Sequence, residues 1–131
     1  MRRRWAKPVP VVLAILLATS LGCRARKLDY SVPSLVKILK QDKDPNMRYY
    51  AAESLGHFGP GGRSAVPDLI AALKDENQTV RMGVAYALGE IGSADAVPAL
   101  QEATKDPEND VRVAAQTALR QIQQKAKGQK K

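Results

Sequence analysis

The sequence predicts an all-α fold, a short solenoid of three helical hairpins that together span residues 31–123. The main observation is a unit that occurs three times, with its copies 33 and 31 residues apart. Helical units of this length stack so that neighbours bury one continuous core. In addition, only 5% of the residues are aromatic, so the core must be built from aliphatic residues and alanine. Such a core suits closely packed helices.

Each unit begins with a short helix. Segments 32–40, 66–74 and 97–105 all start with Val-Pro, carry leucine two residues after the proline and end in lysine. Proline is tolerated in a first helical turn because its missing N–H would have no partner there. We expect the three hairpins at residues 31–59, 64–92 and 95–123.

A longer second helix follows in each unit and opens with a recurring arginine, at Arg48, Arg81 and Arg112. Apolar or small residues fall at −1, +3, +6, +7 and +10 from this arginine, the stripe of a helix with one buried face. The candidate N-caps lie two residues before it, at Asn46, Thr79 and Asp110. Glycines are expected to end the helix in the first two units, namely Gly56, Gly59, Gly89 and Gly92.

The third unit departs from this pattern. Arg120 and Gln123 stand where the first two units have glycines. A polar last helix is expected of a terminal unit, because nothing stacks beyond it. We expect residues 124–131 to form a basic disordered tail.

These patterns together resemble HEAT repeats of the short type found in phycobilisome-lyase-like proteins. Val-Arg opens the second helix, and Ala-Leu-Gly-x-Ile-Gly closes it at residues 87–92. The resemblance covers residues 31–122 and implies a right-handed α-solenoid that acts as a scaffold and not as an enzyme. It also implies a structural role for Arg48, Arg81 and Arg112, each pairing with an acidic residue of an interhelical turn or an adjacent unit. Suitably placed acids are Asp42, Asp44, Asp75 and Asp106.

The net charge of +8 belongs to the ends of the chain. Residues 28–124 hold ten basic and all thirteen acidic residues, so the body is mildly acidic. A body without a basic excess lacks the electrostatic footprint of most DNA- or RNA-binding proteins. We therefore expect no nucleic-acid partner.

The first 22 residues read as an export signal. A basic stretch precedes an apolar run over residues 9–21, which ends among small residues. Residues 20–23, Ser-Leu-Gly-Cys, resemble the lipobox of bacterial lipoproteins, which implies that Cys23 is acylated and becomes the mature N-terminus. Residues 23–30 would then link a membrane anchor to the body, in the cell envelope. Ordinary cleavage after Ser20 or Gly22, giving a soluble exported protein, and an uncleaved anchor remain alternatives.

A candidate partner surface lies on the face of the second helices that the core does not use. Solenoids commonly bind along the concave surface lined by such helices. The positions +1, +5 and +9 from the arginine give three rows, namely Tyr49–Met82–Val113, Glu53–Tyr86–Thr117 and His57–Glu90–Gln121. A solvated stripe has no need of tyrosine and methionine, which are typical anchors of protein interfaces. The competing interpretation is that these residues pack edgewise against neighbouring helices.

Other chemistry has little support in the sequence. Glu53 and His57 stand at i and i+4 and could offer two metal ligands, but no third is evident. No metalloprotease motif, phosphate-binding loop or nucleophile elbow occurs. We expect no cofactor and no small-molecule substrate. The alternatives to a protein-binding scaffold are a self-assembling structural lipoprotein of the envelope and, with less support, a lyase-like or nucleic-acid-acting protein.

Overall fold

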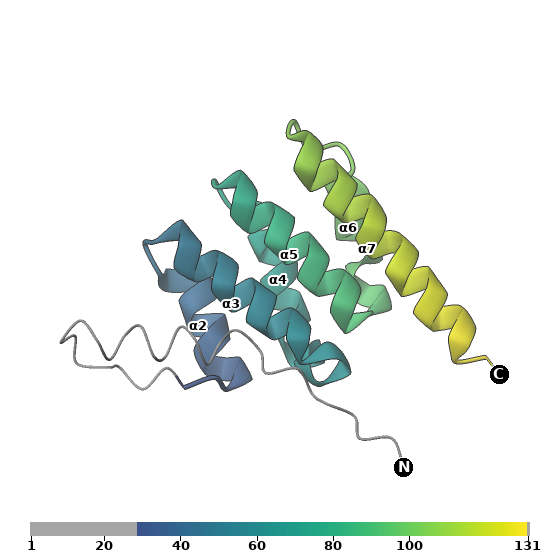
Figure 1. Cartoon of the computed structure of the whole chain (residues 1–131), viewed down its shortest axis with the longest axis horizontal. Coiled ribbons are helices and arrows are strands. Elements are labelled where there is room, and N and C mark those ends of the chain that lie inside the picture. The colour runs from purple at the N-terminus through teal and green to yellow at the C-terminus, as the bar shows by residue number, and fades with distance from the viewer. Residues whose placement is uncertain (1–28, 131) are drawn as a thin grey trace, which may run out of the picture.

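The computed structural model describes residues 29–130, and in this part every regular element is helical. Three hairpins follow one another (Figure 1). They are α2 (Val32–Gln41) with α3 (Pro45–His57), α4 (Val66–Ala72) with α5 (Gln78–Ile91), and α6 (Val97–Ala103) with α7 (Asn109–Gly128). Two 3₁₀ segments join them, η1 (Gly59–Ala65) and η2 (Ala94–Ala96). The predicted all-α fold of three stacked hairpins is confirmed.

The helices form two layers. The second helices α3, α5 and α7 lie side by side in one layer, and α2, α4 and α6 lie behind them (Figure 1). Between the layers lies a core of leucine, valine, isoleucine and alanine, whose largest fully buried members are Leu55, Leu69, Val80, Val84, Leu88, Ile91, Leu100 and Val111. The alanines of the second helices are also buried, which lets these helices approach closely. The second-helix layer is therefore closely packed and offers one broad outer face.

The starts of the second helices differ from the prediction. The N-cap is Asp44 in α3 and Asn77 in α5, two residues before the predicted Asn46 and Thr79. Both caps accept a hydrogen bond from the backbone N–H two residues later, at 2.9 Å. In the third hairpin Glu108 takes this place, not Asp110, and its side chain makes no capping hydrogen bond. Asp110 instead lies in the first turn, where its negative charge is favourable to the helix dipole.

The glycines divide into two kinds. Gly59 and Gly92 have positive φ angles of 52° and 75° and release the chain from the second helix, as predicted. Gly56 and Gly89 do not end helices, which corrects the prediction. A Cβ atom on Gly56 would lie 2.9 Å from Cα of Ala87, and one on Gly89 would lie 2.7 Å from Cα of Ala118. These glycines let consecutive second helices touch.

The chain beyond residue 123 also differs from the prediction of a disordered tail, because α7 continues to Gly128. The extension holds the end of α5. Lys125 Nζ donates hydrogen bonds to the backbone carbonyl oxygens of Gly89, at 3.3 Å, and of Glu90. A cation is favourable there because the last carbonyls of a helix carry partial negative charge.

No helix within residues 29–130 has the length and hydropathy needed to cross a bilayer. The predicted export signal, Cys23 and most of the predicted linker lie outside the described residues.

Candidate protein-binding surface

Two of the three recurring arginines, Arg48 and Arg81, bind one hairpin to the next. The guanidinium of Arg48 donates to both carboxylate oxygens of Asp75 in the next hairpin, from Nε at 2.8 Å and from Nη2 at 2.9 Å. Its Nη1 donates to the carbonyl oxygens of Asp42 and Lys43 in its own hairpin turn. One side chain thus closes a turn and joins two hairpins.

Arg81 repeats this arrangement with Asp106, at 2.9 Å from Nε and 3.1 Å from Nη2. The hydrogen bond from Arg81 is the strongest of the contacts that lower the pKa of Asp106, and burial opposes it. For Asp75, burial raises the pKa, but the hydrogen bonds from Arg48 and the N–H of Asn77 outweigh it and hold the pKa below its ordinary value. Both bridges are consequently charged at neutral pH.

Arg112 ends this series. Its guanidinium donates to the carbonyl oxygens of Asp106 and Pro107, both at 2.8 Å, and to Oδ1 of Asn109. No carboxylate of a following hairpin meets it within the described residues. Arg112 therefore closes its own turn without joining two hairpins.

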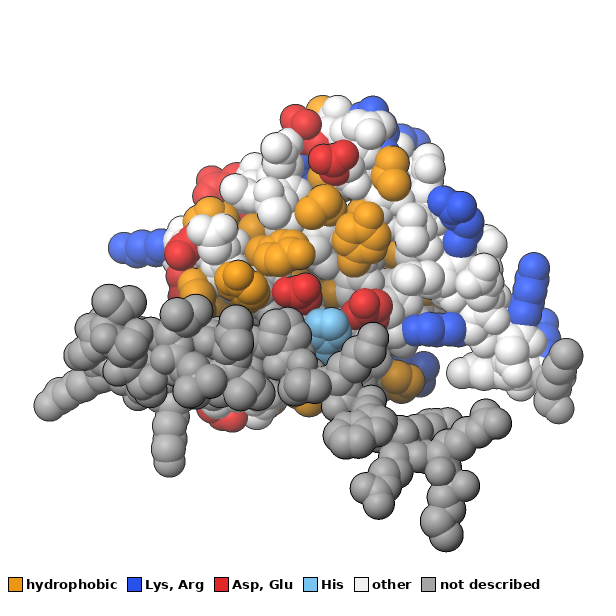
Figure 2. Space-filling model, in the orientation of Figure 1, with side chains coloured by type: hydrophobic (Ala, Val, Ile, Leu, Met, Phe, Trp, Pro, Cys, Tyr) orange, Lys and Arg blue, Asp and Glu red, His pale blue; other side chains and the backbone are white. Residues whose placement is uncertain are grey.

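The nine predicted partner-surface residues, here called the partner stripe, all lie on α3, α5 and α7. Five are exposed, namely Glu53, His57, Tyr86, Glu90 and Val113, and the other four are half-buried, namely Tyr49, Met82, Thr117 and Gln121. Figure 2 shows hydrophobic side chains gathered over the second helices, with acidic side chains and the histidine beside them. Tyr86 and Val113 are 39% and 44% exposed, which is high for such large apolar groups.

Two half-buried residues of the stripe, Tyr49 and Met82, fit both interpretations, a partner surface and edgewise packing against neighbouring helices. Tyr49 and Met82 pack partly against the core. The ring of Tyr49 lies over Gly83 of the next hairpin, since a Cβ atom there would be 2.6 Å from Cδ2 of the tyrosine. Burial, followed by the nearby carboxylate of Glu53, raises the pKa of Tyr49. Tyr49 is therefore a fixed, neutral ring that faces both the core and the surface.

In the third row of the stripe, the side chains of Glu90 and Gln121 each lie over a glycine of the preceding hairpin. Oε2 of Glu90 lies 2.7 Å from the position that a Cβ atom of Gly56 would take, and 3.9 Å from Nδ1 of His57. The amide of Gln121 lies in the same way over Gly89. Oε1 of Gln121 is buried and has no hydrogen-bond partner in the described part of the chain.

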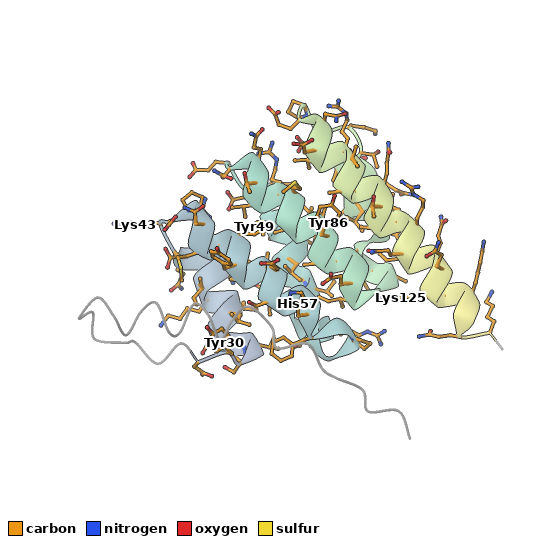
Figure 3. The ribbon with its side chains drawn as sticks, viewed as in Figure 1. Tyr30, Lys43, Tyr49, His57, Tyr86 and Lys125 are labelled. Atoms are coloured by element: carbon orange, nitrogen blue, oxygen red, sulfur yellow. The ribbon has the colours of Figure 1, made fainter. Side chains whose placement is uncertain are left out.

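Two hollows open along the stripe. The smaller, about 180 Å³, is lined by Tyr49, Glu53, His57, Gly83, Tyr86, Ala87, Glu90 and Gln121. The larger, about 330 Å³, is shallower and is lined by Gly56, His57, Glu90, Gln121, Gln124 and Lys125. Figure 3 shows Tyr49, His57 and Tyr86 on α3 and α5, with Lys125 further along on α7. The smaller hollow brings together six of the nine predicted residues.

Sequence reasoning missed three contributors to this surface. Gly83 was not among the predicted residues, although its missing side chain makes room for the ring of Tyr49. Gln124 and Lys125 were assigned to a tail, but they line the larger hollow. The signal that could have found Lys125 is its place one helical turn after Gln121, on the same face of α7. Among residues 29–130, no three side chains of types that bind metals come together.

A family model described as HEAT repeats matches residues 32–120 of the chain. No curated protein matches the sequence.

Proposed function

Because the chain belongs to the HEAT-repeat family, we propose that it is a non-catalytic scaffold that binds a protein partner through the partner stripe. HEAT repeats are commonly protein-interaction scaffolds and generally have no catalytic role. The observation that carries the proposal is the exposure of Tyr86 and Val113 on the same stripe as Tyr49 and Met82, on a closely packed layer to which all three hairpins contribute. Rigid aromatic anchors beside a hollow are typical hot spots of protein interfaces.

Partner capture tests the proposal. Tyr86→Ala combined with Met82→Ala should abolish capture of a protein from envelope extracts, because two anchors of the interface are removed. Tyr86 is exposed, so Tyr86→Ala alone should leave the melting temperature nearly unchanged. Met82 packs partly against the core, so the double variant should melt a few degrees lower.

The matched control is Phe58→Ala. Phe58 is 44% exposed at the end of α3, outside the partner stripe and outside the residues that line the two hollows. Capture should survive this change. If Phe58→Ala and Tyr86→Ala weaken capture equally, or if neither does, the stripe is not the binding surface.

The alternative, a protein that assembles on itself by continuing the stack, has less support. The place of Tyr50 is occupied in α5 by Gly83, which meets Tyr49 of the preceding hairpin, and in α7 by the fully buried Ala114. The place of Gly56 and Gly89, where each second helix meets the next, is occupied by Arg120 in α7. Both ends of the stack thus carry a bulky side chain where close stacking needs a small one. Light scattering separates the two candidates, since a stable monomer is expected for a partner-binding scaffold.

We also propose that the scaffold is exported and anchored in the cell envelope through acylated Cys23. The support is the sequence of residues 1–23 alone, with its basic start, apolar run and Ser-Leu-Gly-Cys end. The native protein should partition with membranes, and Cys23→Ser should move it to the soluble fraction or leave its signal uncleaved. Native protein that is wholly soluble, with an alkylatable Cys23 thiol, would contradict the anchor but not the scaffold.

A further inference from the structure

Two carboxylates and two tyrosine rings line the smaller hollow. Glu53 on α3 and Glu90 on α5 are both exposed, and Tyr49 and Tyr86 line the same hollow. Among residues 29–130, no lysine or arginine lines this hollow, and His57 is the one nitrogen base that does. The hollow is therefore acidic and aromatic.

Three basic side chains of the second helices, one each on α3, α5 and α7, are engaged outside this hollow. The guanidinium groups of Arg48 and Arg81 bind Asp75 and Asp106 on the hairpin turns. Lys125 lines only the larger hollow, where its ammonium binds the carbonyls that end α5. Within residues 29–130, Glu53 has no ion-pair partner, and Glu90 has only His57, at 3.9 Å. Their negative charge is thus available to a partner.

We propose that the scaffold's partner is a basic segment that places an arginine side chain in the smaller hollow, between Glu53 and Glu90. This inference rests on the proposed function and names the chemistry of the partner. Carboxylates accept the guanidinium hydrogen bonds in pairs, and a tyrosine face attracts the same cation. The apolar stem of the arginine lies against Tyr49 and Tyr86.

Gln121 adds a further reason to favour arginine. Its buried amide oxygen has no donor in the described part of the chain, although the residue lines the hollow. Rotation of the amide toward the hollow would give this oxygen a donor if a guanidinium were present, because arginine carries five N–H groups. Lysine offers one compact ammonium and fits this arrangement less well.

Fluorescence anisotropy with a defined probe tests the proposal on the full chain in a neutral detergent. The probe is a labelled nonapeptide with two arginines among alanine and leucine, and its control replaces both arginines with citrulline, which is neutral and similar in shape. The arginine probe should bind about tenfold more tightly than the citrulline probe, and added salt should weaken the difference. Equal binding of the two probes overturns the proposal.

A pair of charge-neutral variants locates the site. Glu53→Gln with Glu90→Gln should weaken the arginine probe about tenfold, because both carboxylates are removed without loss of volume. The matched control, Glu76→Gln with Glu102→Gln, removes the same charge from side chains that are 91% and 77% exposed away from the hollow. This control should change affinity less than twofold. Equal effects of the two pairs would show attraction by overall charge, which overturns the proposal.

Two further outcomes would overturn the proposal of an external basic segment. A variant with Arg24, Arg26 and Lys27 all changed to serine tests whether the chain's own basic segment fills the hollow. A tethered segment that filled the hollow would compete with the probe. If this variant binds the probe about tenfold more tightly than the native chain, the chain's own segment is the occupant and the proposal of an external partner fails. If partner capture needs Tyr86 and Met82 but not Glu53 and Glu90, the scaffold function stands and the basic-partner inference falls.

Discussion

Arg81→Ala should lower the free energy of unfolding by about 3 kcal/mol, because it leaves the shielded carboxylate of Asp106 without its cation. The side chains of Arg81 and Asp106 are only 14% and 10% exposed, so water replaces the bridge poorly. The change also removes the hydrogen bonds from Arg81 to the carbonyl oxygens of Asp75 and Glu76. Urea denaturation followed by circular dichroism measures the loss.

Arg112→Ala is the matched control. It removes the same side chain at the same place in the third hairpin, where the guanidinium donates no hydrogen bond to a carboxylate. Hydrogen bonds to neutral oxygens disappear together with a weak charge attraction to Asp106, which keeps its bridge to Arg81, so the cost should be about 1–2 kcal/mol. Equal losses for the two variants would show that the bridge between hairpins contributes nothing beyond closing its turn.

The same bridge predicts how stability depends on pH. Arg81 holds the pKa of Asp106 in the folded protein below its ordinary value. A lowered folded-state pKa stabilises the fold at pH values above the unfolded pKa, and that stabilisation is lost as pH falls through the folded one. The difference in stability between the native protein and Arg81→Ala should therefore be full at neutral pH and shrink below about pH 4.

Gly89→Leu should cost about 3 kcal/mol or prevent stacking of the third hairpin, because α5 and α7 touch at this residue. A Cβ atom there would lie 2.7 Å from Cα of Ala118, a backbone atom that cannot move without the whole of α7. Thermal unfolding and limited proteolysis of α7 measure the effect. The result would also show that this glycine is kept for close packing and not for ending a helix.

Gly128→Leu provides the control for that prediction. A Cβ atom on Gly128, at the end of α7, would meet no atom within 4 Å. Replacing a helical glycine in open space stabilises the helix by up to about 1 kcal/mol, so this variant should melt no lower than the native protein. If both glycine variants lose stability equally, the cause is added hydrophobicity and not the helix contact.

The repeat pattern predicted the fold because the same sequence features occur in all three units. The recurring Val-Pro, arginine and leucine positions fixed the hairpins and the buried face of each second helix. The caps were placed two residues too late because each turn offers two polar candidates, such as Asp44 and Asn46. Pro45 between them could have decided the matter, since proline favours the first helical position and makes Asp44 the cap.

The details of the candidate surface were harder to predict because they depend on contacts between hairpins. The sequence identified Tyr49 and Tyr86 on one stripe, but not that Gly83 seats the ring of Tyr49. The sequence also could not show that Lys125 reaches back to α5, which needs the distance between two helices. Local periodicity defines the face of a helix, whereas the neighbour that meets this face follows only from the stack.

The two arginine bridges run in one direction, since each hairpin supplies the guanidinium and the next supplies the carboxylate. A shortened chain that lost its third hairpin would therefore lose polar contacts of the middle hairpin as well as part of the core. Arg81 would keep its own turn but have no acid, while α5 would lose the lysine that caps it. A chain shortened from the other end would keep Arg81, Asp106 and Lys125 together but would leave the shielded carboxylate of Asp75 without the guanidinium of Arg48. The middle hairpin thus depends on both neighbours in different ways, since its arginine needs the carboxylate of its successor and its aspartate needs the guanidinium of its predecessor.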